Sequence, residues 1–129
     1  MKKNILISTG GSGGHVVPAM IFHEHLNNRF NIFISSDERG LKFLDKKKYN
    51  IQIIKVPKIS KNIFLFPAQI LLIFYLIFKS YLFLKSKKIE KVISTGGYMS
   101  LPLCVASKIL NIKLFLFEPN MVLGRLNKL

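Results

Sequence analysis

Two glycine-rich segments hold the residues whose types and spacing could do chemistry. The first reads Thr-Gly-Gly-Ser-Gly-Gly-His over residues 9–15, and the second reads Ser-Thr-Gly-Gly-Tyr-Met-Ser over residues 94–100. Each follows a short apolar run and precedes a helix-like segment. Glycines allow a tight turn and a close approach of backbone N–H groups to a ligand, and a helix N-terminus adds partial positive charge. We therefore expect a phosphate or diphosphate ligand, and the two loops could face one cleft.

The common nucleotide-binding motifs do not match these loops. A dinucleotide fingerprint that begins at Gly11 needs a glycine at position 16, which is Val16, and the chain has no Gly-Lys-Ser/Thr of a P-loop. Asp37, at the end of the second predicted strand, could bind a ribose, but a solvated turn aspartate is the more common explanation. A dinucleotide site is therefore not favoured.

No group of side chains predicts a metal site or another cofactor. His23 and His25 alternate in a way that no single metal site explains, and the sequence has no His/Cys cluster or paired acids. The single cysteine, Cys104, lies in an apolar-periodic segment and is interpreted as a buried structural thiol. One cysteine cannot form an intrachain disulfide, which fits a reducing cytosol. The N-terminal apolar run is also too short for a signal peptide.

Short apolar segments alternate with helix-like segments and must position the two loops. The predicted strands are rich in Ile, Val and Phe, which is typical of strands buried on both faces of a parallel sheet. They are residues 5–8, 31–35, 51–56, 91–95 and 113–117, and the predicted helices are residues 15–28, 40–47, 67–85 and 101–110. This order predicts a Rossmann-like, doubly wound α/β fold, in which ligands bind outside the carboxyl ends of the strands.

The composition indicates one globular domain that is both basic and apolar. Its 129 residues are 50% hydrophobic, and 20 Lys plus Arg against 6 Asp plus Glu give a formal net charge of +14, which favours an anionic partner. Because the mean hydropathy is also high, at +0.32, we expect that partner to be an anionic membrane surface and not nucleic acid.

Residues 63–84 form the most apolar stretch of the chain. A helix over residues 67–84 would be about 27 Å long, which barely reaches across a hydrocarbon core of about 30 Å, and Lys79 inside it counts against a crossing. Its faces are apolar nearly all round, whereas the sheet can cover only one of them, so a second face is expected to contact lipid. Whether the helix spans the membrane or lies in it stays open. The predicted membrane-contacting residues are Phe64, Phe66, Ile70, Phe74, Ile77, Phe78, Lys79 and Lys85.

Lysines surround this stretch. Residues 42–91 contain twelve lysines against Asp45 and Glu90. Each lysine near an anionic leaflet adds about 1 kcal/mol of attraction, so a few of them together with one inserted helix face would give peripheral attachment. A solvated lysine face is the alternative, but such a face would not need the adjoining apolar helix.

Three motifs follow one another along the chain: Gly-Gly-Ser-Gly-Gly-His at residues 10–15 with Pro18-Ala19 after it, Gly-Gly-Tyr-Met-Ser-Leu-Pro at residues 96–102, and Glu-Pro-Asn at residues 118–120 with Gly124 and Asn127-Lys128. Together they resemble the motifs of the MurG glycosyltransferase family. The family usually has Thr at the position of Ser12 and Gln at the position of Pro119. The replacement by proline removes a side-chain amide and a backbone donor from the third motif.

The resemblance implies the amino-terminal half of a two-domain GT-B enzyme. Such an enzyme moves N-acetylglucosamine from a UDP donor to undecaprenyl-pyrophosphoryl-N-acetylmuramyl-pentapeptide, which turns lipid I into lipid II for peptidoglycan at the cytoplasmic face of the bacterial inner membrane. In that family the amino-terminal domain handles the lipid acceptor, and the carboxyl-terminal domain binds most of the nucleotide. Residues 1–129 would be the acceptor-side domain without the donor domain: a fragment, a truncated gene product or half of a split enzyme.

The same resemblance assigns roles to single residues. Those expected to bind substrate are Ser12, Gly13, Gly14, Gly96, Gly97, Tyr98 and Asn120. His15 lies at the mouth of the first loop, where an imidazole could take a proton from the acceptor hydroxyl, or could only hydrogen-bond the backbone or a phosphate. Glu118 could be the base instead, or could orient an acceptor hydroxyl.

Two other functions compete with catalysis. The chain could be a membrane-anchoring, non-catalytic subunit that recruits a separate donor-binding chain. A basic nucleic-acid-binding protein is less favoured, because nucleic-acid binding does not explain the apolar helix.

Overall fold

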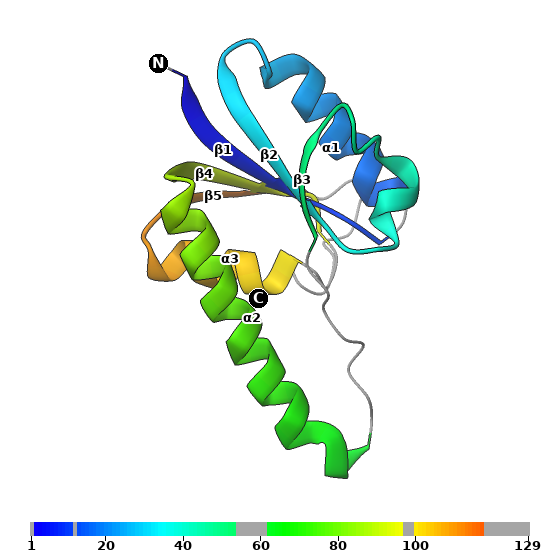
Figure 1. Ribbon diagram of the computed structural model, residues 1–129, viewed down its shortest axis with the longest axis vertical. Coiled ribbons are helices and arrows are strands. Elements are labelled where there is room, and N and C mark those ends of the chain that lie inside the picture. The colour runs from blue at the N-terminus through cyan, green and yellow to red at the C-terminus, as the bar shows by residue number, and fades with distance from the viewer. Residues whose placement is uncertain (1, 12, 54–61, 97–99, 118–129) are drawn as a thin grey trace.

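The computed structural model describes residues 2–11, 13–53, 62–96 and 100–117 and contains a parallel sheet with helices on both faces (Figure 1). The strands are β1 (Lys3–Ser8), β2 (Phe30–Ser36), β3 (Asn50–Ile53), β4 (Ile89–Ser94) and β5 (Lys113–Leu116). The helices are α1 (Gly13–Leu26), α2 (Phe66–Ser86) and α3 (Leu101–Ile109), with the 3-10 helices η1 (Gly40–Phe43) and η2 (Ile63–Leu65).

The strand order places the two glycine loops next to each other. The sheet has five strands in the order β3-β2-β1-β4-β5, and Ser8 at the end of β1 lies in register with both Ser35 of β2 and Ser94 of β4. The carboxyl ends of β1, β2 and β4 therefore lie side by side at one edge of the sheet. Because the strand order reverses between β1 and β4, this edge is the switch point at which doubly wound folds bind ligands. The predicted Rossmann-like architecture is confirmed.

Side chains alternate along β1 and divide the core into two layers. Ile5 and Ile7 pack with Val16 of α1 on one face, whereas Leu6 packs with Leu84 of α2 on the other. Figure 1 shows α1 on one side of the sheet and α2 with α3 on the other. Strand β1 is thus covered on both faces, which explains its continuous apolar run, whereas β5 at the end of the sheet has no buried residue.

One predicted helix is wrong. Of residues 40–47, only Gly40–Phe43 is helical, and it forms a 3-10 turn. The Asp45 carboxylate accepts a hydrogen bond from the Lys47 N–H group at 2.9 Å. This local bond competes with helix propagation and closes a turn. The third strand, predicted over residues 51–56, is Asn50–Ile53 in the described part of the chain. The ends of the other strands and helices lie within two residues of the predicted ends.

The Cys104 side chain is partly buried, so the prediction of a buried thiol holds only in part. Burial raises the pKa of the Cys104 thiol above its ordinary value, more than Ser94 and Ser100 lower it. A thiol that stays protonated is a poor nucleophile, which agrees with a structural role.

Helix α2 is packed along only part of its length. Its buried residues, Leu76, Ser80 and Leu84, are four positions apart in the carboxyl-terminal half, and no residue of 66–75 is buried. The Ser80 hydroxyl donates to the Leu76 carbonyl at 2.8 Å, so its burial leaves no hydroxyl unpaired. In Figure 1 the amino-terminal half of α2 projects away from the sheet.

The exposed half of α2 is strongly apolar. Phe64 of η2 is 91% exposed, and Leu71 and Phe74 are 70% and 64% exposed. By length and composition Ile63–Ser86 could cross a membrane. Its most apolar 18-residue stretch has a mean hydropathy of 2.0, and only 11% of that stretch is buried in the protein. A soluble core helix buries such residues, so the predicted second apolar face without a protein partner is confirmed for the described residues.

Replacing Leu84 by Ala should lower the free energy of unfolding by about 3 kcal/mol, because this side chain is 1% exposed and its loss opens a cavity between α2 and the sheet. Leu82→Ala is the matched control on the same helix, where the side chain is 48% exposed. It should cost less than about 1 kcal/mol. Urea unfolding followed by circular dichroism measures both, and equal losses would contradict the described orientation of α2.

Candidate substrate-binding site

Two buried threonines join the glycine loops. The Thr95 hydroxyl donates to Thr9 Oγ1 at 2.8 Å, and the Thr9 hydroxyl donates to the His15 carbonyl at 2.9 Å. Both threonine side chains are fully buried. The Thr95 N–H group also donates to the Ser8 carbonyl at 3.0 Å, which continues the strand pairing into the second loop. The two loops therefore start side by side from one hydrogen-bonded point, and the prediction that they could face one cleft stays a prediction.

His15 is held by the second loop although it belongs to the first. Its Nδ1 atom lies 2.9 Å from the Thr95 carbonyl oxygen. A carbonyl oxygen only accepts hydrogen bonds, so Nδ1 carries a proton and donates, and in the neutral ring Nε2 is the atom with the free lone pair. The imidazole is only partly buried. Nε2 can thus accept a proton from a bound group, while the bond to Thr95 fixes the ring.

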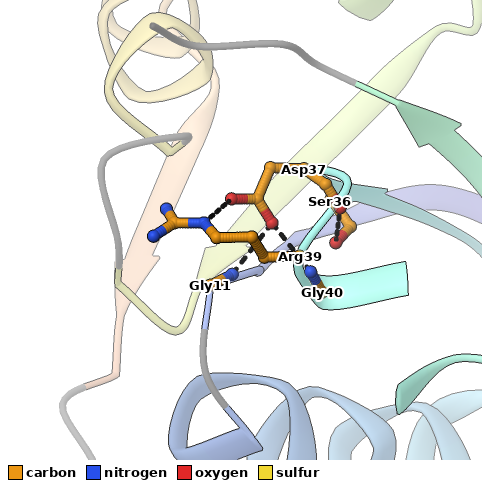
Figure 2. Close-up of polar contacts among 5 residues, drawn as sticks. All are labelled: Gly11, Ser36, Asp37, Arg39 and Gly40. Atoms are coloured by element: carbon orange, nitrogen blue, oxygen red, sulfur yellow. Dashed lines mark hydrogen bonds and ion pairs between the residues drawn. The ribbon is translucent and has the colours of Figure 1, made fainter. Parts of the chain in front are cut away.

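Asp37 is the central acceptor of the first loop (Figure 2). Its Oδ1 atom accepts hydrogen bonds from the N–H groups of Gly11 and Gly40, both at 2.9 Å. Its Oδ2 atom accepts from Arg39 Nε at 3.0 Å. Asp37 is 8% exposed, so the interpretation as a solvated turn aspartate is wrong. The carboxylate instead ties the end of β2 to the turn that follows β1.

Three donors keep the Asp37 carboxyl group ionised. Burial alone raises the pKa of this group, but the hydrogen bonds from Gly11 and Gly40 and the nearby Arg39 charge together hold the pKa below its ordinary value. The carboxylate is therefore charged in the folded protein over the whole neutral range.

Backbone conformation explains one glycine, Gly11, and close packing explains another, Gly40. Gly11 has a φ of 78°, which other residues rarely adopt. A Cβ atom on Gly40 would collide with Ser36 Oγ and would lie 2.8 Å from the Gly10 Cα atom. The chain after β2 thus packs directly on the first glycine turn, and a side chain at position 40 would push the two segments apart.

Some loop donors are already used within the protein. The Gly11 N–H group donates to Asp37, and the Gly96 N–H group donates to Ser94 Oγ at 3.3 Å. Backbone donors for an anion must come from elsewhere, and the first turn of α1 at Gly13 and Gly14 has N–H groups without intrahelical acceptors. The arrangement can therefore receive an anion at the start of α1, the helix that carries His15.

The structure brings together Gly13, Gly14, His15 and Gly96 at the carboxyl edge between β1 and β4. Other predicted site residues lie outside the described residues; they are Ser12, Gly97, Tyr98, Glu118 and Asn120. Among the residues that the structure describes, no group of three or more His, Cys, Asp and Glu side chains could hold a metal ion.

The predicted membrane-contacting residues lie on η2 and α2. The exposed aromatic side chains among them are Phe64, Phe66, Phe74 and Phe78. Ile70 is 36% exposed, Ile77 is half-buried, and Lys79 and Lys85 are exposed. These residues occupy α2 and the 3-10 turn that precedes it, and none of them belongs to the glycine loops.

Sequence reasoning missed the roles of Thr9, Thr95, Arg39 and Gly40. The signal for the last two was present, because an aspartate at a strand end that precedes a glycine by three positions is typical of a side-chain-to-backbone turn. The threonine pair left no such signal, since its partners are 86 positions apart.

The chain is similar to known glycosyltransferases. Residues 5–129 match the model of the glycosyltransferase family 28 N-terminal domain. The UDP-N-acetylglucosamine–N-acetylmuramyl-(pentapeptide) pyrophosphoryl-undecaprenol N-acetylglucosamine transferase of Pelagibacter ubique (strain HTCC1062) is 59% identical over 128 residues, which cover 99% of this chain and 36% of the relative. The protein of the same name from Prochlorococcus marinus (strain MIT 9215) is 37% identical, over 98% of this chain and 35% of the relative.

A solved structure shares the fold. The crystal structure of Acinetobacter baumannii MurG superposes with a TM-score of 0.81 at 22% identity, covering 99% of this chain and 38% of that chain. The chain thus spans about a third of the length of the curated relatives it matches.

Asp37→Asn should lower the free energy of unfolding by about 1–2 kcal/mol at pH 7, because it removes the charge from a buried hydrogen-bonded group. The folded-state pKa of Asp37 is below its unfolded value, so this contribution is complete above about pH 4 and is lost as the pH falls through the folded pKa. Denaturant unfolding at several pH values measures it, with the exposed Asp45→Asn as control. A difference between wild type and Asp37→Asn that grows as the pH falls would contradict this assignment.

Proposed function

The chain belongs to the family of glycosyltransferase family 28 N-terminal domains, and on that premise we propose that it supplies the lipid-acceptor half of an N-acetylglucosaminyltransferase of peptidoglycan synthesis. The donor is UDP-N-acetylglucosamine, and the acceptor is undecaprenyl-pyrophosphoryl-N-acetylmuramyl-pentapeptide. The observation that carries the proposal is the joining of two glycine loops at the sheet's switch point with His15 held between them. The name of the 59% identical relative supports the choice of substrates.

In the proposed reaction His15 is the general base. Nε2 takes the proton of the acceptor sugar hydroxyl, the hydroxyl oxygen forms a bond to C1 of N-acetylglucosamine, and the bond from C1 to the UDP oxygen breaks with inversion. The bond from Nδ1 to the Thr95 carbonyl orients the ring and stabilises the positive charge that forms on it. Backbone N–H groups at the start of α1 hold a phosphate of the substrate. Ser12, Gly97, Tyr98 and Asn120 complete the proposed binding site, with Glu118 as the other candidate base.

The proposed division of labour gives residues 1–129 the acceptor and a second domain or chain the nucleotide. The relatives that the chain matches are about three times as long as the matched part, which leaves room for a nucleotide-binding domain of similar size. GT-B catalysis in this proposal takes place between the carboxyl edge of this sheet and that second domain.

The exposed half of α2 is the proposed membrane contact, on the cytoplasmic face of the inner membrane. Residues 66–75 have no buried side chain and extend over about 15 Å, which is half of a hydrocarbon core. From Leu76 onward one face of the helix packs on α3 and the sheet. These lengths favour insertion of the first half of α2 with η2 and argue against a crossing while the domain is folded.

Cations adjoin this apolar surface. Lys79 Nζ lies 5.3 Å from the centre of the Tyr75 ring, and Lys85 Nζ lies 5.8 Å from that of Tyr81. Such long side chains cover apolar surface with their methylene groups while the ammonium group reaches the head groups. Anionic lipid would therefore meet both lysine ammonium groups and apolar side chains on α2.

His15→Ala should reduce glycosyl transfer by about 100-fold or more while changing acceptor KM little, because the general base acts in the transition state. The assay uses a chimaera of this chain with the remaining sequence of the Pelagibacter ubique relative, UDP-N-acetylglucosamine and a soluble lipid I analogue. His25→Ala, an exposed histidine of the same helix, is the matched control.

Three outcomes of this assay decide the proposal. Wild-type turnover by His15→Ala would exclude His15 as the base and leave Glu118. An inactive wild-type chimaera that still binds the acceptor would favour the non-catalytic anchoring subunit. Failure to bind the acceptor at all would overturn the proposed function.

Phe74→Asp should weaken binding of the chain to vesicles of phosphatidylcholine and phosphatidylglycerol by about tenfold or more, because an apolar side chain that enters the lipid becomes charged. Ile21→Asp is the matched control, since this side chain is 54% exposed on α1, on the opposite face of the sheet. Co-sedimentation measures both variants. Equal weakening by the two variants would contradict docking through α2.

A further inference from the structure

The segment between β2 and β3 forms one wall of the first glycine loop. Asp37 Oδ1 accepts from the Gly11 N–H group, Gly40 packs on the Gly10 Cα atom, and a Cβ atom on Gly13 would lie 3.3 Å from the Phe43 ring. Three successive contacts thus fix this segment along the loop. Arg39 lies within this segment, between Asp37 and Gly40, whose contacts with the glycine turn hold the backbone on either side of it.

Arg39 is held at one end of its guanidinium group only. Its Nε atom donates to Asp37 Oδ2 at 3.0 Å, yet the side chain is 55% exposed. Figure 2 shows the two terminal nitrogens pointing away from the Asp37 carboxylate. The carboxylate therefore fixes the plane of the guanidinium while leaving the terminal N–H groups for another acceptor.

A phosphate-binding site at these loops needs further hydrogen-bond donors and a positive charge. The Gly11 and Gly96 N–H groups are used within the protein, so the glycine loops offer fewer donors than their sequence suggests. The ionised Asp37 carboxylate would also repel an anion unless a cation faced it. Arg39 neutralises this charge and adds donors at the same place.

The residue type supports this role. The chain has 17 lysines and only three arginines. A lysine ammonium is a point charge, whereas the planar guanidinium can bond a carboxylate through Nε and a phosphate through its terminal N–H groups at once. The position beside Asp37 is one where only arginine can do both.

We propose that Arg39 binds a phosphate group of the pyrophosphoryl substrate, with Asp37 as the positioning residue that holds both the guanidinium and the glycine turn. The identity of the substrate rests on the proposed function. The geometry itself calls for an anion that can accept two parallel N–H bonds.

Calorimetric titration of the whole chain with inorganic pyrophosphate tests the proposal. Arg39→Gln should raise the dissociation constant by about tenfold or more, because it removes charge-assisted bonds to the anion. Arg39→Lys should recover only part of the affinity, since lysine keeps the charge and loses the fork. Arg29→Gln, an exposed arginine just before β2 at the other edge of the sheet, removes the same charge and should change affinity by less than about twofold.

Asp37→Asn separates positioning from simple charge. Removal of a negative charge near an anion should tighten binding by Coulomb's law, whereas loss of positioning should weaken it. We expect weaker binding, by about threefold or more. Tighter binding would overturn the positioning role. The Arg39 variants leave the bonds from Gly11 and Gly40 to Asp37 in place, so they test the phosphate contact without disturbing the turn.

The inference and the proposed function fail in different ways. Equal losses for Arg39→Gln and Arg29→Gln, or no binding of pyrophosphate by the wild-type chain at millimolar concentration, would overturn the inference whether or not the chimaera transfers sugar. Binding through Arg39 by a chain whose chimaera transfers no N-acetylglucosamine would uphold the inference and count against the proposed function.

Discussion

The pairing of β1 with β4 is the constraint on which the rest of the structure depends. These strands are far apart in the sequence, and their parallel register brings Ser8 beside Ser94, so the two glycine loops begin at the same height. The buried hydrogen bond between the Thr9 and Thr95 hydroxyls then joins the loops directly. Because an unpaired buried hydroxyl is costly, neither loop can shift without breaking a bond that water does not replace. His15 derives its orientation from this junction.

Glycine-rich loops are commonly described as cradles of free amides, but here much of their hydrogen bonding faces inward. Asp37 takes the N–H groups of Gly11 and Gly40, and Ser94 takes that of Gly96. The donors thus used make the turn rigid, which lowers the entropy lost when a ligand binds. The cost is a carboxylate close to the proposed anion site, and in that proposal Arg39 offsets its charge. The Asp37 side chain therefore both holds the glycine turn in place and puts a negative charge beside it.

Helix α2 combines two environments along one axis. Its carboxyl-terminal half contributes Leu76 and Leu84 to the core, and its amino-terminal half has apolar side chains without a protein partner in the described structure. The packed half fixes the direction in which the free half projects. In the proposed membrane contact, such a helix would enter the lipid surface without unfolding the sheet and would hold the domain at a set orientation to that surface.

The sequence by itself determined the fold class, the places of most strands and helices, the position of both glycine loops at one edge and the second apolar face of α2. These follow from periodicity and from the order of elements, which act over short distances along the chain. The 40–47 segment was mispredicted as a helix, because the Asp45 side chain closes a turn that apolar periodicity does not encode.

Only the tertiary structure decided what Asp37, Arg39, Thr9 and Thr95 do. Each acts through a partner brought close by strand pairing, and a hydrogen bond depends on positions fixed to a few tenths of an ångström. Residue types and spacing indicate which groups could form hydrogen bonds. The packed sheet determines which of these groups lie close enough to form them.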